Sequence, residues 1–296
     1  MRNKQFQHKG AAGFIVITLV LLMIGCAGTK KFDFGSADTG FILTYRAAKE
    51  AVMKYHTTQN MVILQEIMGQ EMEVVTERVM DYSMQTEAIT TKGEMHFSLT
   101  FDKFTSQSKS PQGEFSVDSE ELIGKSVKIG IGAHGDVTEK SGFDELPKIT
   151  MAGQDVNLEE QFRELLPPLA AKPVKIGATW EKARTDTTAA GPMDIIIEST
   201  NTYTLVEEIE MNGQACLKIK AESVFTVGGE GSQGGADIVF EGDGEGTEEI
   251  IFAYQAGTLL KRTSDTLIEG TAMVTGAANM TIPMTQEIKE SIELLP

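Results

Sequence analysis

The feature that most restricts the fold of this chain is an alternation of apolar and polar residues, which recurs from Phe41 to the C-terminus. Between residues 94 and 102, for example, Met95, Phe97, Leu99 and Phe101 alternate with polar residues. The same pattern is found at 80–85, 127–131, 215–221, 250–254 and 282–288. A period of two predicts β-strands with one dry face and one wet face. Such strands are typical of antiparallel sheets, since parallel strands are usually covered on both faces.

Turn residues between the alternating segments indicate hairpins and a weak internal repeat. Lys92-Gly93, Asn212-Gly213 and Ala256-Gly257 each separate two such segments. Gly93 precedes Gly213 by 120 residues, and Gly135 precedes Gly257 by 122 residues. We therefore expect two related β units, residues 41–150 and 176–296. The alternative is that any two sets of amphipathic hairpins look alike.

The segment between these units, residues 151–175, breaks the alternation. Leu158, Phe162, Leu165 and Leu166 have helical spacing, which predicts a short helix over 156–166 that is followed by a proline-rich stretch. Asn157 is the expected N-cap, and Pro167-Pro168 ends the helix. Residues 46–55 have helix propensity, but the repeat favours a strand there.

The resulting fold class is mainly β and antiparallel, with two weakly related units joined by a short helix. The dry faces of the strands must be covered. The sheet can do this by closing as a sandwich or barrel, or by curling into a half-barrel whose inner face holds a ligand.

The first 25 residues have the pattern of a secretory signal. Arg2, Lys4 and Lys9 precede an apolar stretch at 14–24, which is shorter than the roughly 20 residues that span a bilayer. Residues 26–40 are rich in turn-forming residues and read as a tether.

The sequence Gly25-Cys26-Ala27 resembles the lipobox of bacterial lipoproteins, although Met23 stands where that family prefers leucine. The resemblance implies a diacylglycerol on the Cys26 thiol, cleavage before Cys26 and acylation of the new amine. Alanine after the cysteine, in this family, fits sorting to the outer membrane. The alternative is an ordinary cleaved signal followed by a chance cysteine. More than one acyl chain gives stable anchoring to a membrane.

The charge of the chain excludes several partners. The signal holds three of the 26 basic residues and none of the 43 acidic ones, so the remainder has 23 against 43, a net charge of −20. Nucleic-acid binding needs clustered Lys and Arg, and docking onto anionic headgroups needs the same. We therefore expect no nucleic-acid partner, and membrane contact only through the lipid anchor.

Residues 172–180, Lys-Pro-Val-Lys-Ile-Gly-Ala-Thr-Trp, resemble a motif of an uncharacterised family of secreted bacterial β-rich proteins and lipoproteins. The likeness covers most of the mature chain, but only this joining motif is specific. The resemblance implies no known activity.

No pattern in the sequence predicts a catalytic, cofactor or metal site. Cys216 lies among alternating apolar residues, so we expect a buried thiol and not a reactive one. Residues 230–234 lack the first glycine of a hydrolase elbow and read as a hairpin loop. Glu241, Asp243 and Glu245 could attract Ca²⁺, but their spacing favours the solvated face of a strand, with glycines on the other face.

The strongest binding hypothesis concerns the dry face of the first unit. Its methionines adapt to irregular partners, which suits an apolar ligand, although they could equally fill the core. The expected apolar ligand face consists of Met80, Tyr82, Met84, Met95, Phe97 and Leu99.

We therefore predict a non-enzymatic lipoprotein of the outer membrane that binds a lipid or other apolar ligand in a curled sheet. The alternative is an adaptor that docks onto an envelope protein assembly by an exposed strand edge. A hydrolase with an unrecognised site is the third hypothesis.

Overall fold

The structure, a computed structural model, describes residues 33–151, 154–190, 193–276 and 279–296. Residues Phe34–Pro296 form one compact unit. The signal at 1–25 and the lipidation residue Cys26 lie outside the described residues. None of the helices in the described part of the chain is long and apolar enough to cross a membrane.

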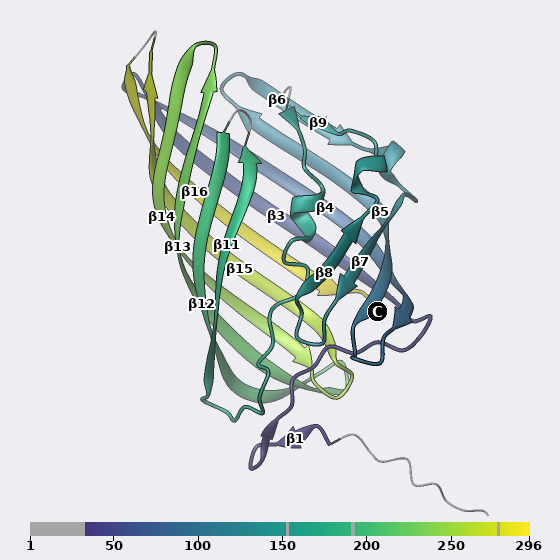
Figure 1. Cartoon of the computed structure of the whole chain (residues 1–296). Helices are drawn as coiled ribbons and strands as arrows, with labels where there is room; N and C mark the ends of the chain where they lie inside the picture. Colours follow the sequence, from purple (N-terminus) through teal and green to yellow (C-terminus); the bar gives the residue numbers. More distant parts are fainter. Residues whose placement is uncertain (1–32, 152–153, 191–192, 277–278) are drawn as a thin grey trace, which may run out of the picture. The chain divides into compact units, whose positions relative to one another are not determined.

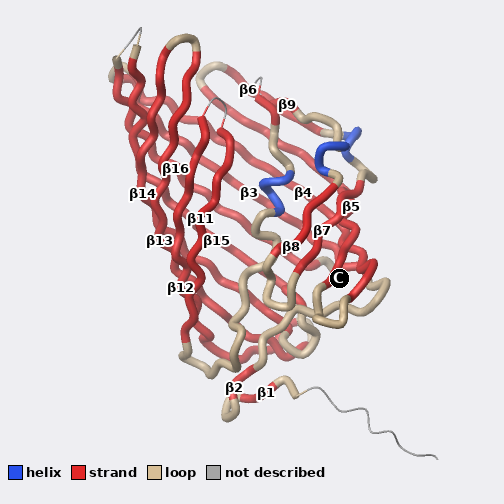
Figure 2. The backbone as a smooth tube through the Cα atoms, in the orientation of Figure 1, coloured by secondary structure: helices blue, strands red, loops and turns tan. Residues whose placement is uncertain are grey.

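The alternating segments form one large antiparallel sheet of 12 strands (Figures 1 and 2). Its order is β11-β12-β13-β14-β15-β16-β3-β4-β5-β7-β8, and β6 pairs with β5 beside this path. In the first predicted unit the strands are β3 (Val52–Ile67), β4 (Gln70–Ile89), β5 (Met95–Ser110), β6 (Gly113–Asp118), β7 (Ser126–Ile131) and β8 (Val137–Ser141). In the second they are β11 (Thr179–Ala190), β12 (Met193–Met211), β13 (Gln214–Gln233), β14 (Ala236–Ala253), β15 (Thr258–Thr275) and β16 (Met280–Leu294).

The predicted fold class is confirmed: the body is mainly β and antiparallel, and its sheet is curled without closing into a barrel. The two predicted units join edge to edge, because β16 pairs with β3. An aromatic pair occupies a similar place in each unit. Tyr55 of β3 stacks on Tyr82 of β4, and Trp180 of β11 stacks on Tyr203 of β12. The repeat itself stays a prediction that these two pairs support.

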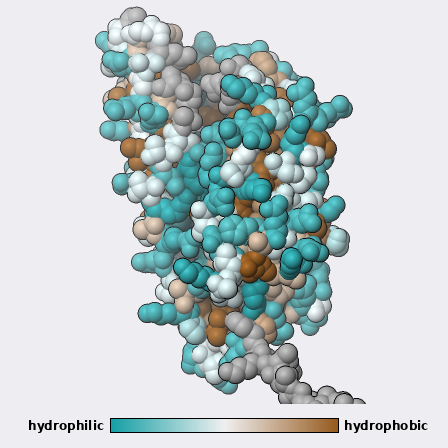
Figure 3. Space-filling model, turned by 45° about the vertical axis from the view of Figure 1, so that its right-hand side comes forward, coloured by the Kyte–Doolittle hydropathy of each residue, from teal (hydrophilic) through white to brown (hydrophobic). Residues whose placement is uncertain are grey.

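The strands divide their residues between a convex, wet face and a concave, dry face. Glu241, Asp243 and Glu245 are exposed on β14, as expected of a solvated strand. The intervening glycines lie on the concave side, where Gly244 contacts the ring of Phe225. The face of the molecule in Figure 3 is mostly hydrophilic, with apolar side chains scattered among the hydrophilic ones.

The expected helix over 156–166 is wrong. The structure has a 3-10 helix of four residues, η3 (Glu159–Phe162), and the chain then passes through a turn and a bend before Pro167-Pro168. A residue before proline is driven away from the helical region, and an isolated helix this short is marginal. Asn157 still satisfies the start of the turn, since its Oδ1 accepts hydrogen bonds from the amides of Glu159 and Glu160.

Two boundaries also differ from the sequence prediction. Residues 46–51 form no strand, and β3 begins at Val52. The body begins before the predicted end of the tether at 40. There β1 (Gly35–Ser36) pairs with β2 (Gly40–Phe41), and Phe41 is buried against Tyr254. A second small hairpin pairs β9 (Thr150–Met151) with β10 (Gln154–Asp155).

The main core fills one end of the curled sheet. It is made by the concave residues of the strands near the turns at 92–93, 212–213 and 256–257, together with residues 156–174. A small satellite cluster lies apart from it, formed by Cys216, Ile251, Ala253 and Leu260. The prediction that Cys216 is buried is confirmed, and burial raises the pKa of its thiol, which favours the protonated form.

Candidate functional site

Residues 156–174, which we call the plug segment, lie on the concave face of the sheet. Phe162 is fully buried, and its ring meets Tyr82 of β4 and Phe101 of β5 edge-on. Leu165, Leu166 and Leu169 follow it into the core. The plug segment therefore supplies, from one irregular stretch, the cover that the dry face of the sheet needs at this end.

Side chains from two other parts of the chain, the connection between β2 and β3 and strand β11, donate hydrogen bonds to backbone carbonyl groups of the plug segment. Tyr45 donates its hydroxyl to the carbonyl oxygen of Pro167 at 2.8 Å, and the indole N–H of Trp180 donates to that of Pro168 at 3.3 Å. A buried segment without regular structure must find such partners for its polar groups. The tryptophan that ends the 172–180 motif thus holds the prolines in place.

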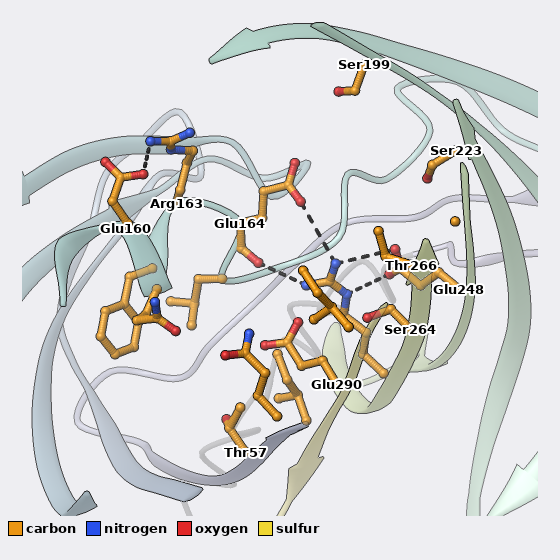
Figure 4. Close-up of a pocket in the computed structure, with 18 of the residues that line it drawn as sticks. Thr57, Glu160, Arg163, Glu164, Ser199, Ser223, Glu248, Ser264, Thr266 and Glu290 are labelled. Carbon is orange, nitrogen blue, oxygen red and sulfur yellow. Dashed lines mark hydrogen bonds and ion pairs between the residues drawn. The ribbon is translucent and has the colours of Figure 1, made fainter. Parts of the chain in front are cut away.

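A cavity of about 500 Å³ lies between the plug segment and the concave face. This volume falls within the range of roughly 300–1,000 Å³ expected of small-molecule sites. Its floor is the plug segment, and its wall comes from β3, β4, β11, β12, β13, β14, β15 and β16. Figure 4 shows Glu164 of the plug segment and Glu248 and Glu290 of the sheet converging on it.

Arg262 lies at the centre of the charged part of the cavity. Its Nε donates to Glu248 Oε1 at 2.8 Å and its Nη2 to Glu248 Oε2 at 3.4 Å, a bidentate arrangement. Nη1 donates to the carbonyl oxygen of Glu164 at 3.2 Å. Burial acts against the charge of Arg262, but Glu248 and Glu290 outweigh it and raise the pKa of the guanidinium. Arg262 is therefore a permanent cation that ties the plug segment to β14 and β15.

Two more arginines fasten the plug segment to the edge strand β11. Arg184 forms ion pairs with Glu164 and, at 2.9 Å, with Asp186. Arg163 pairs with Glu160 and donates to the carbonyl oxygen of Thr187 at 3.3 Å. These charges satisfy one another, so they stabilise the floor of the cavity and leave little unpaired charge for a ligand.

Arg78 of β4 is held differently. Its Nη1 donates to two side-chain amides, Gln161 at 2.7 Å and Gln59 at 3.3 Å. No carboxylate in the described ranges forms an ion pair with it, and its buried Nε has no hydrogen-bond partner. Burial lowers the pKa of Arg78, and the Glu290 carboxylate acts in the opposite direction.

The wall opposite Arg78 is apolar. Ile197 of β12, Phe225 of β13 and Ile268 of β15 line the cavity. They pack against a cluster farther along the sheet, built on Ile195 of β12, Val227 of β13 and Phe240 of β14. Glycines make this wall possible, since a Cβ on Gly244 would lie 2.1 Å from the Phe225 ring. The cavity is therefore amphipathic, with charged groups near the floor and apolar side chains beyond.

The six residues of the predicted ligand face are all buried, at 4% exposure or less. Met80 and Tyr82 line the large cavity. Met84, Met95 and Phe97 lie deeper and border only a small void near Tyr45, and Leu99 belongs to the main core. The structure thus places two of these six residues, Met80 and Tyr82, at the cavity. That the six residues contact a ligand stays a prediction.

The charged residues of the cavity were missed by the sequence analysis, although a signal for them exists. Glu248 occupies the same set of alternate, inward-facing positions of its strand as Ile250 and Phe252. Arg78 likewise shares the inward-facing positions of its strand with Met80, and Glu290 shares those of its strand with Ile292. A charged residue at a dry position of an alternating strand indicates a polar pocket, since unpaired buried charge is costly.

The histidines in the described part of the chain lie away from the cavity lining. His56 Nδ1 contacts Asp81 Oδ1 at 2.5 Å on the convex face, and His96 Nδ1 contacts Glu139 at 3.3 Å. Within the described ranges, no group of three or more His, Cys, Asp and Glu residues is placed to hold a metal ion.

No family model matches this sequence, and no curated protein matches it. Among solved structures it is similar to OccK2 (OpdF) of Pseudomonas aeruginosa in complex with glucuronate, with a TM-score of 0.26 and 6% identity over 85% of this chain and 100% of that one. It is also similar to OccK11 (OpdR) of the same organism, with a TM-score of 0.23 and 10% identity over 87% and 100%. A BenF-like porin from Pseudomonas fluorescens gives a TM-score of 0.20 and 8% identity over 84% and 100%. Likeness this weak carries no argument about fold or function.

Proposed function

We propose that this protein is a non-enzymatic, lipid-anchored binding protein of the bacterial outer membrane, which holds an amphiphilic ligand in its curled sheet. The observation that carries the proposal is the cavity of about 500 Å³ on the concave face, with both charged and apolar lining. A structural core would be filled by side chains, as it is at the end of the sheet that the plug segment covers, which we call the plugged end. Here glycines and small hydroxyl residues line the concave face instead, which leaves room for a guest.

The ligand is tested with the full chain, expressed in the envelope of a Gram-negative bacterium and purified in detergent. Mass spectrometry of the organic extract should identify a co-purified amphiphile. Ser199 lines the cavity, whereas its neighbour Thr200 is exposed on the convex face. The variant Ser199→Trp should therefore lose the amphiphile, and Thr200→Trp should retain it.

Equal amounts of lipid in both variants would show that the lipid binds to the outer surface of the protein and does not occupy the cavity. Absence of any stoichiometric amphiphile from the wild type would overturn the proposal.

The anchor is tested separately, because the binding function and the anchoring could each be wrong. Cells that express the full chain are labelled with a clickable palmitate analogue and fractionated. The wild type should carry label and sediment with the outer membrane, and Cys26→Ala should carry none. Label-free wild-type protein in the periplasmic fraction would contradict the lipoprotein assignment.

An adaptor in an envelope assembly is the second candidate function. The observation that favours it is β11, a strand of 12 residues that ends the sheet at one edge. Edge strands offer free backbone groups to a partner strand. Crosslinking through a photoreactive residue placed on β11 should then yield one stoichiometric protein adduct and no bound lipid.

A further inference from the structure

Three side chains of the cavity stand in one row across neighbouring strands. Glu290 of β16 is directly opposite Gln59 of β3, and Gln59 is directly opposite Arg78 of β4. Residues that face each other in this way point to the same side of a sheet, and all three line the cavity. The row therefore has an anion at one end, an amide in the middle and a cation at the other end.

Among the described residues, the two ends of this row are the charged groups of the cavity lining that form no ion pair. The remaining carboxylates that line it, Glu160, Glu164, Asp186 and Glu248, all form ion pairs with Arg163, Arg184 or Arg262. Arg78 bonds only to neutral amides, and Glu290 has no ion pair or hydrogen bond within the described ranges. Their backbones are two strand spacings apart, about 10 Å.

We infer that the cavity takes an amphiphile whose head group is zwitterionic, with its anionic group on Arg78 and its ammonium group on Glu290. This inference rests on the proposed function and names the class of ligand. An occupant that displaces water from the cavity leaves any unmatched charge buried, which is costly. A purely anionic head would pair with Arg78 and leave Glu290 unmatched, and a purely cationic head would do the reverse. Only a head with both charges satisfies the whole row.

The apolar wall decides where the rest of such a ligand lies. Phe225, Ile268 and Ile288 line the cavity beside the row, and Phe225 and Ile268 pack against the apolar cluster that includes Phe240 of β14. Acyl chains that leave the head group can bury their surface there. The head group then sits near the plug segment, where Gln161 already orients Arg78.

The test measures the affinity of the delipidated full chain for short-chain probes by titration calorimetry. Dihexanoylphosphatidylethanolamine is the zwitterionic probe, dihexanoylphosphatidylglycerol the anionic one and decyltrimethylammonium the cationic one. We expect the wild type to bind the zwitterionic probe about 30-fold more tightly than the other two, since each of those leaves one buried charge unpaired. Free phosphoethanolamine, which lacks acyl chains, should bind at least roughly ten-fold more weakly.

Variants at the two ends of the row should change this preference in opposite directions. Arg78→Gln should make the cationic probe the best ligand, and Glu290→Gln should make the anionic probe the best ligand. The exposed neighbours supply matched controls on the convex face, so Glu77→Gln and Lys289→Gln should keep the wild-type order. The ranking of probes by the wild type decides the question even if a variant fails to fold.

The inference and the proposed function fail in different ways. If the wild type binds the anionic or the cationic probe as tightly as the zwitterionic one, the inference is wrong and an amphiphile carrier remains. If phosphoethanolamine binds as tightly as its acylated form, the site belongs to a small zwitterion. If no probe binds while an amphiphile co-purifies, the head-group assignment is wrong. If neither is seen, both proposals fall.

Discussion

The long strands of the curled sheet have two halves that differ in packing. In the plugged half their concave residues pack against the plug segment, and in the open half they line the cavity. Along β13 the concave residues are Leu217, Ile219 and Ala221 at the plugged end, followed by Ser223 and Phe225 at the cavity. Along β14 the order from the plugged end is Phe252, Ile250, Glu248 and then glycines. The alternation that makes the strands is unbroken, so the change lies only in the size and polarity of the inward residues. A long strand can thus carry a packed core and an open site in succession.

The plug segment marks the border between the halves. Where it covers the concave face, buried side chains exclude solvent, and where it ends, the cavity begins. Besides the hydrogen bonds from Tyr45 and Trp180, two kinds of contact hold it there, the aromatic contacts of Phe162 and the ion pairs of Arg262 and Arg184 with Glu164. The first belongs to the core and the second to the cavity, so substitutions can separate them.

The largest expected effect follows from removing the aromatic anchor. Phe162→Ala should lower the free energy of unfolding by about 3–5 kcal/mol, because a fully buried phenyl ring leaves a cavity that the core cannot refill. Phe225→Ala, in the open half, should cost only about 1–2 kcal/mol, since its ring is partly exposed already. Urea unfolding followed by circular dichroism measures both. Equal losses would mean that the two halves are packed alike and would break the comparison.

The next effect concerns the ion pair at the border. Arg262→Leu alone should destabilise the fold by about 3 kcal/mol, because Glu248 is left buried without its partner. The double variant Arg262→Leu with Glu248→Leu should recover most of that loss, as apolar replacements of buried pairs often do. A double-mutant cycle in urea gives the coupling energy. No recovery in the double variant would show that Arg262 acts through the carbonyl of Glu164 instead.

The smallest expected effect tests whether the glycines of the open half are needed for packing. Gly244→Ala should cost about 1–3 kcal/mol, because the added methyl group would overlap the Phe225 ring. Gly228 has nothing within 4 Å of an added Cβ, so Gly228→Ala should be neutral or stabilising by up to about 1 kcal/mol. Thermal unfolding of the two variants side by side checks this. Equal effects would show that strand propensity, and not contact with Phe225, governs these positions.

Much of the sheet could be predicted from local patterns. The alternation at 95–101 and 215–221 predicts strands, and the turns at Lys92-Gly93 and Asn212-Gly213 predict their hairpins. The exposed row of Glu241, Asp243 and Glu245 and the burial of Cys216 follow from the same period. These features depend on neighbours in sequence, which is why one chain suffices to find them.

The plug segment and the cavity could not be predicted in this way. Phe162 meets Tyr82 and Phe101, which lie 80 and 61 positions earlier, so its burial depends on how the sheet curls. The spacing of Leu158, Phe162 and Leu165 is shared by a helix and by a stretch that crosses a core, and periodicity does not separate the two. The charges at dry positions were a usable signal, but their pairing depends on strand register.

The hairpin of β1 and β2 shows at which end of the strands the chain enters the body. Its Phe41 contacts Tyr254 and bridges to Val174, so the chain enters the fold at the filled end of the strands. Along β14 the cavity residues Glu248 and Gly246 come before this end, on the side of the turn at 234–235. The chain therefore enters the body at one end of these strands and lines the cavity toward the other. Substitutions in the hairpin of β1 and β2 can thus be made at a distance from the residues that line the cavity.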